Sequence, residues 1–161
     1  MSPRPNCTYR KGLFQMTAQP VVRVGVGAFV VRADGKFLLG LRASSHGAGT
    51  WQLPGGHLEV GESWGECGAR EVLEEAGVKI GTPTFVAVTN DVFDPTNKHY
   101  ITIFVKANCL DAEPVAQVLE PEKCKCWEWV DWEEVFGSES RYRPLFLPMT
   151  HLREQITKRP W

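Results

Sequence analysis

Acidic side chains are concentrated in residues 56–78, which read GHLEVGESWGECGAREVLEEAGV. Glu71, Glu74 and Glu75 are spaced by three and four residues, so on a helix their Cβ atoms lie roughly 5–6 Å apart. Like charges at this spacing weaken a helix, and no lysine interleaves them. Mg²⁺ prefers such oxygen ligands and shares its coordination with water and substrate phosphates. The cluster is therefore a candidate metal site, with a solvated acidic face as the alternative, and the complete motif given below favours the metal site.

A short helix with defined ends is predicted to carry these carboxylates. Ser63 followed by Glu66 is a capping box, in which the two side chains bond to backbone N–H groups of the first turn. Gly77 occupies the position where helices end in a left-handed residue. We expect the glutamates on the face opposite the apolar residues that pack on a sheet, which are Ala69, Val72, Leu73 and Ala76.

The segment before the helix supplies tight backbone and a partner for an arginine. The loop Leu53-Pro54-Gly55-Gly56 can turn a carbonyl towards a cation. Arg70 on the flank of the helix can hold Glu62 in a bidentate pair that fixes the loop against the helix. The alternative for Arg70 is an ordinary helix arginine.

Together these residues complete the pattern G-x5-E-x7-R-E-U-x-E-E-x-G-U, where U is aliphatic. The specified positions are Gly56, Glu62, Arg70, Glu71, Val72, Glu74, Glu75, Gly77 and Val78. In this the chain resembles the Nudix hydrolases, and most closely the small MutT-type nucleotide pyrophosphatases of the cytosolic animal and plant kind. The resemblance covers residues 21 to about 136 and implies an α/β protein with the Nudix fold, an α/β/α sandwich around a mixed sheet.

The resemblance also implies a reaction, the hydrolysis of a nucleoside diphosphate linked to another moiety. A nucleoside triphosphate, whether ordinary, oxidised or modified, would yield the monophosphate and pyrophosphate. Hydrolysis of ADP-ribose, a nucleotide sugar or another diphosphate is the alternative. A non-catalytic Nudix-fold protein that binds a nucleotide or RNA is a third possibility, which the four retained motif glutamates disfavour. The implied cofactor is Mg²⁺, with Mn²⁺ as the other candidate, and the implied assembly is a homodimer.

Roles for the acidic residues follow from the same resemblance. Glu71 and Glu75 are the principal expected metal ligands, with Glu74 as a third ligand or supporting group and the carbonyl of Gly55 as a backbone ligand. A distal ligand is expected in the stretch Glu120-Pro121-Glu122, where we favour Glu122 over Glu120. The general base stays open between Glu75, Glu71 and the distal glutamate.

Further residues are candidates for contact with the substrate. Arg42 is a candidate phosphate contact, with simple surface exposure as its alternative. Gly55, Gly56 and His57 belong to the motif loop and must lie beside the metal. The candidates for the base pocket are Phe93, His99, Tyr100, Trp132 and Phe136, although aromatic residues are more often part of the core.

Composition limits the remaining classes of function. The 161 residues carry a net charge of −1, so no overall field attracts nucleic acid or an anionic membrane. No apolar run is long enough to span a bilayer. The five scattered cysteines and the lack of a secretory signal suggest a reducing, cytoplasmic location. We expect a disordered arm over residues 1–20, with Met16 as an alternative start, and a single domain over 21–161.

The remaining strands and helices are predicted from the spacing of apolar residues and from residues that favour turns. Asp34-Gly35 and the Pro95–Asn97 segment mark turns between strands. Asp131 is expected to cap a short helix through Val135, with Glu134 in a capping box. Pro144 and Pro148 are expected to break the chain before a terminal helix over 150–158. The expected strands cover residues 21–32, 36–41, 51–53, 84–93, 99–107 and 126–130.

Overall fold

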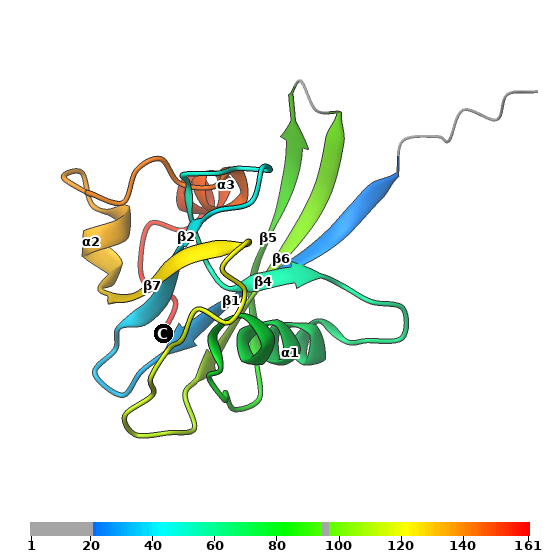
Figure 1. Ribbon diagram of the computed structural model, residues 1–161. Helices are drawn as coiled ribbons and strands as arrows, with labels where there is room; N and C mark the ends of the chain where they lie inside the picture. Colours follow the sequence, from blue (N-terminus) through cyan, green and yellow to red (C-terminus); the bar gives the residue numbers. More distant parts are fainter. Residues whose placement is uncertain (1–20, 95–96) are drawn as a thin grey trace, which may run out of the picture.

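The computed structural model describes residues 21–94 and 97–161, so the expectations for the 1–20 arm, Met16 and Pro95 concern residues outside this range. Within the described residues, seven strands form one sheet (Figure 1). The strands are β1 (Val22–Val31), β2 (Phe37–Arg42), β3 (Trp51–Gln52), β4 (Gly55–His57), β5 (Thr84–Phe93), β6 (Lys98–Asn108) and β7 (Cys124–Val130). All the predicted strands are therefore present, with β7 starting two residues earlier than expected.

The sheet is mixed, as predicted. Its main path runs β3-β2-β1-β6-β5, while β4 pairs with β1 and β7 pairs with β2. β1 and β6 are parallel along ten residue pairs, and the other pairings are antiparallel. This order places the motif strand β4 against the middle of β1, next to the helix that carries the glutamates.

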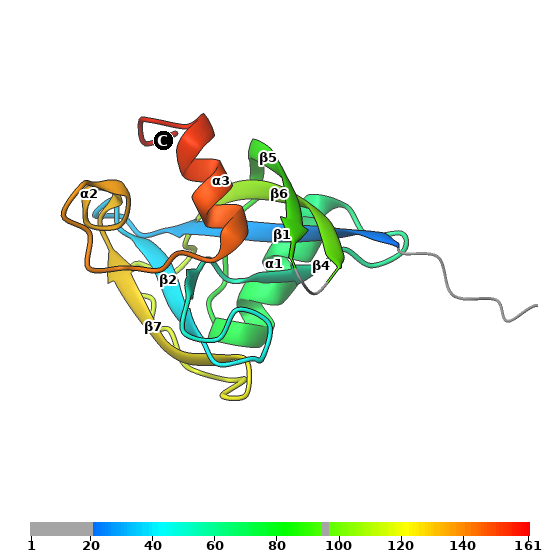
Figure 2. The ribbon, with the colours of Figure 1, turned by 90° about the horizontal axis from the view of Figure 1, so that it is seen from above.

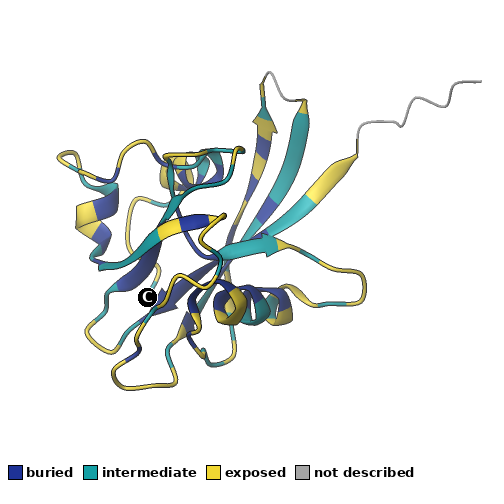
Figure 3. Ribbon diagram, in the orientation of Figure 1, coloured by how far each residue is buried: buried dark blue, intermediate teal, exposed yellow. Residues whose placement is uncertain are grey.

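Helices cover both faces of the sheet and give the expected α/β/α arrangement (Figures 1 and 2). α1 (Trp64–Ala76) lies on one face, and α2 (Trp132–Phe136) and α3 (Leu147–Gln155) lie on the other. β1 shows why two cores form, because Val26 and Val30 point towards α1 whereas Phe29 points to the opposite core. The buried strand centres and the exposed outer sides of the helices are visible in Figure 3.

α1 has the predicted ends. Ser63 is its N-cap in a complete capping box with Glu66, and Gly77 closes it in the left-handed region with φ 69°. The predicted faces are wrong in two respects, because Leu73 is exposed and because Glu71 and Glu75 are buried with Val72 and Ala76 rather than opposite them. A Cβ added at Gly68 would lie 3.0 Å from Val105, so the helix approaches the sheet most closely there. This contact turns Leu73 outwards and turns two of the glutamates inwards.

The C-terminal elements differ slightly from the expected ones. α2 follows Asp131, whose N–H donates to the Glu134 carboxylate at 2.8 Å. α3 starts at Leu147 rather than residue 150, because Pro148 lies in its first turn, where a proline costs the helix no hydrogen bond. None of the helices in the described part of the chain is long and apolar enough to cross a membrane.

Candidate active site

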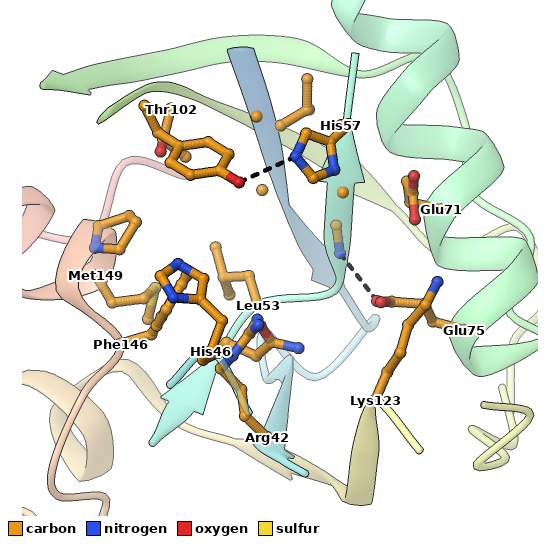
Figure 4. A pocket seen from close by; sticks show the side chains of 18 of the residues that line it. Arg42, His46, Leu53, His57, Glu71, Glu75, Thr102, Lys123, Phe146 and Met149 are labelled. Carbon is orange, nitrogen blue, oxygen red and sulfur yellow. Dashed lines mark hydrogen bonds between the residues drawn. The ribbon is translucent and has the colours of Figure 1, made fainter. Parts of the chain in front are cut away.

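A cavity of about 530 Å³ lies between α1, β4 and the segment that leads into α3 (Figure 4). This volume is in the range of pockets that hold a small-molecule ligand. Carboxylates of α1 line one end and aromatic side chains line the other. The cavity therefore has one end suited to a charged group and one suited to a flat apolar group.

Glu71 and Glu75 form the carboxylate end, and both are buried, with 6% and 3% of their surface exposed. The Gly55 N–H donates to Glu75 Oε2 at 3.0 Å (Figure 4). A Cβ added at Gly56 would lie 2.2 Å from Glu71 Oε1. The second glycine of the motif loop thus has no side chain because the Glu71 carboxylate occupies that space.

The buried position changes the acidity of Glu75. Burial raises its pKa from the ordinary 4.5 to about 7, and the nearby charge of Glu71 acts in the same direction. The hydrogen bond from Gly55 opposes this shift without cancelling it. A cation bound beside Glu71 and Glu75 would stabilise the charged form of Glu75, which burial and the neighbouring carboxylate disfavour.

Arg70 forms the predicted bidentate pair with Glu62. Its Nε lies 2.8 Å from Glu62 Oε1 and its Nη2 lies 3.1 Å from Oε2. The Arg70 hydrogen bond lowers the pKa of Glu62 to about 2. Nη1 also lies 2.7 Å from Glu71 Oε1 and 3.1 Å from Glu74 Oε2. Arg70 therefore holds the motif loop to α1 and orients the carboxylate of Glu71.

Glu74 is less closely associated with the site than the sequence suggested. It lines the cavity, but half of its side chain is exposed and it is held by Arg70. Among residues 21–94 and 97–161, no three acidic, histidine or cysteine side chains come together as a ready-made metal cage. The structure instead brings together the pair Glu71 and Glu75. Their oxygen donors, burial and mutual repulsion fit a hard divalent cation.

The two candidate distal glutamates differ in burial. Glu122 is exposed and does not line the cavity. Glu120 is half-buried, and its charge contributes to the raised pKa of Glu75. Lys123, whose Nζ lies 2.7 Å from Glu120 Oε2, lines the cavity and acts on Glu75 in the opposite direction. Neither glutamate lines the cavity, but Glu120 is the more buried of the two and the one whose charge acts on Glu75.

The apolar end of the cavity is formed by rings from four separate segments. The His46 ring centroid lies 4.4 Å from Phe93, 5.6 Å from Phe146 and 6.1 Å from Tyr100. His46 Nε2 is buried and has no hydrogen-bond partner among the described residues. Phe93 and Tyr100 were predicted here. His46 and Phe146 were not, because each lies in an irregular segment without a motif.

Arg42 lies inside the site rather than on the surface. It ends β2, lines the cavity, and its guanidinium carbon lies 4.1 Å from the centroid of the Phe146 ring. It donates to the carbonyl of His46 at 2.9 Å and to the side chain of Gln52. Burial lowers the pKa of Arg42. These bonds organise the 43–50 loop, so the role of Arg42 as a phosphate contact stays a prediction.

The other predicted substrate contacts divide into two groups. His57 lines the cavity, and its Nε2 lies 3.1 Å from the Tyr100 hydroxyl (Figure 4). His99 does not line the cavity and instead lies 2.6 Å from Asn90 Oδ1. The placement of Trp132 in the pocket was wrong, because its ring packs in the core at 4.2 Å from Phe136 and 6.0 Å from Phe29. The N-terminus of α2 directs Trp132 under the sheet, away from the cavity.

Comparison with known proteins agrees with this arrangement. The family model of the NUDIX domain matches residues 21–149. The chain belongs to the Nudix family. This Nudix chain is therefore a hydrolase of the family that acts on nucleotide diphosphate derivatives.

The relatives of this Nudix chain include two curated bacterial proteins. Phosphatase NudJ of Escherichia coli is 28% identical over 119 residues, which is 73% of this chain and 74% of NudJ. A MutT-like protein of Streptomyces ambofaciens is 44% identical over 66 residues, which is 41% of each chain. The match therefore spans less than half of the Streptomyces protein. These relatives lend no support to the narrower likeness to animal and plant enzymes.

A solved structure gives the same fold. The MutT NUDIX hydrolase of Burkholderia pseudomallei superimposes with a TM-score of 0.70 at 27% identity, covering 84% of this chain and 98% of that one. The expected Nudix fold is thus confirmed.

Proposed function

We propose that this Nudix hydrolase converts a nucleoside triphosphate, including oxidised or modified ones, to the monophosphate and pyrophosphate with Mg²⁺ or Mn²⁺. The observation that carries the proposal is one cavity with two buried carboxylates, Glu71 and Glu75, at one end and a ring cluster at the other. A nucleotide has the same two-part chemistry, with anionic phosphates joined to a flat base.

Residues of this chain would divide the work as follows. Glu71, Glu75 and the Gly55 carbonyl would hold the ion, with Glu74 and Glu120 beside them. A bound divalent cation neutralises charge on the phosphates and acidifies a water. We assign proton removal from the attacking water to Glu75 ahead of Glu71, because Arg70 already occupies Glu71 Oε1. Arg70 would keep Glu71 oriented through the reaction.

Contacts with the substrate would come from both ends of the cavity. Gly56, His57 and Arg42 lie where phosphates would enter, and Phe93 lies in the ring cluster where a base would stack. The relatives, a phosphatase and MutT proteins, support phosphate chemistry without naming a substrate.

The test is turnover of a panel of nucleoside triphosphates, ADP-ribose and nucleotide sugars with Mg²⁺, with products separated by ion-exchange chromatography. We expect a triphosphate to give monophosphate and pyrophosphate. Glu75→Gln should lower kcat/KM by about 10²-fold or more, the usual contribution of a general base. The matched control Glu122→Gln, on an exposed residue of the same type, should retain activity.

Other outcomes would count against the proposal. Release of orthophosphate, or full activity in Glu75→Gln, would contradict the assigned chemistry. Turnover of ADP-ribose alone would move the protein to the alternative substrate class. Binding of nucleotides without any turnover would favour the non-catalytic alternative.

We also propose a single domain over residues 21–161, a homodimer and a cytoplasmic location. The four cysteines in the described residues are all free, which supports a reducing compartment. Support for the dimer comes from the edge strand β5, whose exposed side chains include Phe85, Val88 and Val92.

A further inference from the structure

A buried carboxylate lies directly behind the wall of the cavity. Asp91 on β5 is fully buried and does not itself line the cavity. Its Oδ2 accepts from Thr89 Oγ1 at 2.8 Å and from Thr102 Oγ1 at 2.6 Å. Its Oδ1 lies 2.7 Å from Nδ1 of His151 on α3. Two hydroxyl donors and one imidazole nitrogen thus converge on one carboxylate, whose oxygens accept hydrogen bonds.

Thr102 connects this carboxylate to the cavity. Thr102 lines the cavity (Figure 4). Thr102 Oγ1 lies 4.0 Å from the point where a Cβ of Gly25 would be, and Gly25 lines the cavity as well. The missing side chain at Gly25 therefore leaves room for a ligand atom to reach the hydroxyl.

The polarity of that hydroxyl follows from its bond to Asp91. A threonine hydroxyl has one hydrogen and two lone pairs. Because the hydrogen is donated to the carboxylate, only lone pairs remain for a ligand. A free hydroxyl could rotate and serve either a donor or an acceptor, whereas this one serves only a donor.

We propose that Thr102 determines base specificity by accepting a hydrogen bond from an N–H group of the nucleobase, and that Asp91 is the positioning residue that fixes its polarity. This inference rests on the proposed function, since it assumes that the cavity holds a base. A base with an acceptor at that point would face lone pairs and lose a hydrogen bond, which buried sites penalise strongly.

His151 links the same carboxylate to the opposite wall of the cavity. α3 carries His151 and also Pro148 and Met149, which line the cavity. The bond from His151 to Asp91 therefore ties α3 to β5 at the depth of Thr102. One carboxylate sets both the polarity of the hydroxyl and the position of the neighbouring wall.

The experiment measures binding of nucleoside monophosphates to the full chain by isothermal titration calorimetry without metal. It uses pairs in which one member has an additional N–H donor group. AMP and GMP have an exocyclic amino group that purine riboside monophosphate and IMP lack, and 8-oxo-GMP has an N7–H, together with a C8 carbonyl, that GMP lacks. We expect the wild type to bind the member with the extra N–H about tenfold or more tightly in at least one pair. Thr102→Ser, which keeps the hydroxyl, should preserve that ratio.

Two variants should remove the preference. Thr102→Val keeps the shape and deletes the acceptor, and Asp91→Asn supplies an amide that can donate to Thr102 and free its hydrogen. In both, the ratio should fall below about threefold, whereas a merely structural role would weaken both members of a pair equally. If Asp91→Asn does not fold, Thr102→Val by itself tests the proposal.

The inference is overturned if no pair is discriminated by the wild type, or if Thr102→Val keeps the wild-type ratio. Failure of the proposed reaction has a different signature. In that case the pairs would be discriminated as expected, but no triphosphate would release pyrophosphate with Mg²⁺.

Discussion

Environment, more than residue type, distinguishes the glutamates of this motif. Glu71 and Glu75 are buried beside a pair of glycines, whereas Glu74 is half exposed and Glu62 is paired with Arg70. Burial raises the pKa of Glu75 to about 7, and the arginine lowers that of Glu62 to about 2. Four side chains of one kind thus have different tasks, with Glu62 anchoring the loop and the buried pair facing the cavity.

The raised pKa of Glu75 predicts how stability depends on pH when metal is absent. The folded state favours the neutral, protonated form of Glu75. The contribution of this protonated side chain to the stability of the fold is therefore complete below pH 4.5 and is lost as pH rises through about 7. At pH 8 the free energy of unfolding of Glu75→Gln, measured by urea denaturation, should therefore exceed that of the wild type by on the order of 3 kcal/mol. At pH 4.5 the two free energies of unfolding should be equal.

Mg²⁺ should reverse this difference in the free energy of unfolding between the wild type and Glu75→Gln. At pH 8, Mg²⁺ should raise the free energy of unfolding of the wild type and have little effect on Glu75→Gln, because the ion binds the folded state through the charged carboxylates. Glu122→Gln should behave like the wild type, since Glu122 is exposed. An equal Mg²⁺ effect in wild type and Glu75→Gln would contradict the role of Glu75 as a ligand.

Gly56 gives a second prediction at this scale. A methyl group at this position would overlap the Glu71 carboxylate, whose oxygen lies 2.2 Å from the added Cβ. Gly56→Ala should displace Glu71, weaken Mn²⁺ binding measured by calorimetry and lower kcat. Gly65→Ala is the matched control, since the nearest atom to its added Cβ is in Pro83 at 3.7 Å. Gly49→Ala would not serve as the control, because Gly49 has a positive φ.

At the scale of elements, the carboxylate end is local and the aromatic end is not. Loop, β4 and α1 are consecutive in the chain, so the caps at Ser63 and Gly77 and the Arg70–Glu62 pair assemble within residues 53–77. The ring cluster instead joins the β2–β3 loop, β5, β6 and the segment before α3. Variation in those segments can change the base contacts without altering the phosphate end.

Two phenylalanines near the C-terminus should therefore behave differently. Phe146 lines the cavity, whereas Phe136 packs on Trp132 in the core. Phe146→Ala should raise KM roughly tenfold, the usual value of one stacking contact, with a small change in stability. Phe136→Ala should lower the free energy of unfolding and leave KM nearly unchanged. Steady-state kinetics and urea denaturation on both variants check this, and the reverse pattern would place the pocket on the α2 side.

At the scale of the molecule, the sheet order leaves β5 at an edge with Val88 and Val92 exposed on it. Unpaired edges of this kind readily associate with another chain. We expect sedimentation equilibrium to show a dimer and Val88→Lys to give a monomer. Val115→Lys, on an exposed valine of a distant loop, should leave the dimer intact. A monomeric wild type at tens of micromolar protein would refute the homodimer.

The sequence by itself determined the family motif, the ends of α1, the strands and the Arg70–Glu62 pair, because these depend on side chains a few residues apart and on simple periodicity. Only the tertiary structure decided that Leu73 faces solvent and that Glu120 is more buried than Glu122. The tertiary structure also decided that Trp132 belongs to the core while His46 and Phe146 line the cavity. Those outcomes depend on how closely Gly68 lets α1 approach the sheet and on contacts between segments up to a hundred residues apart, which no local pattern records.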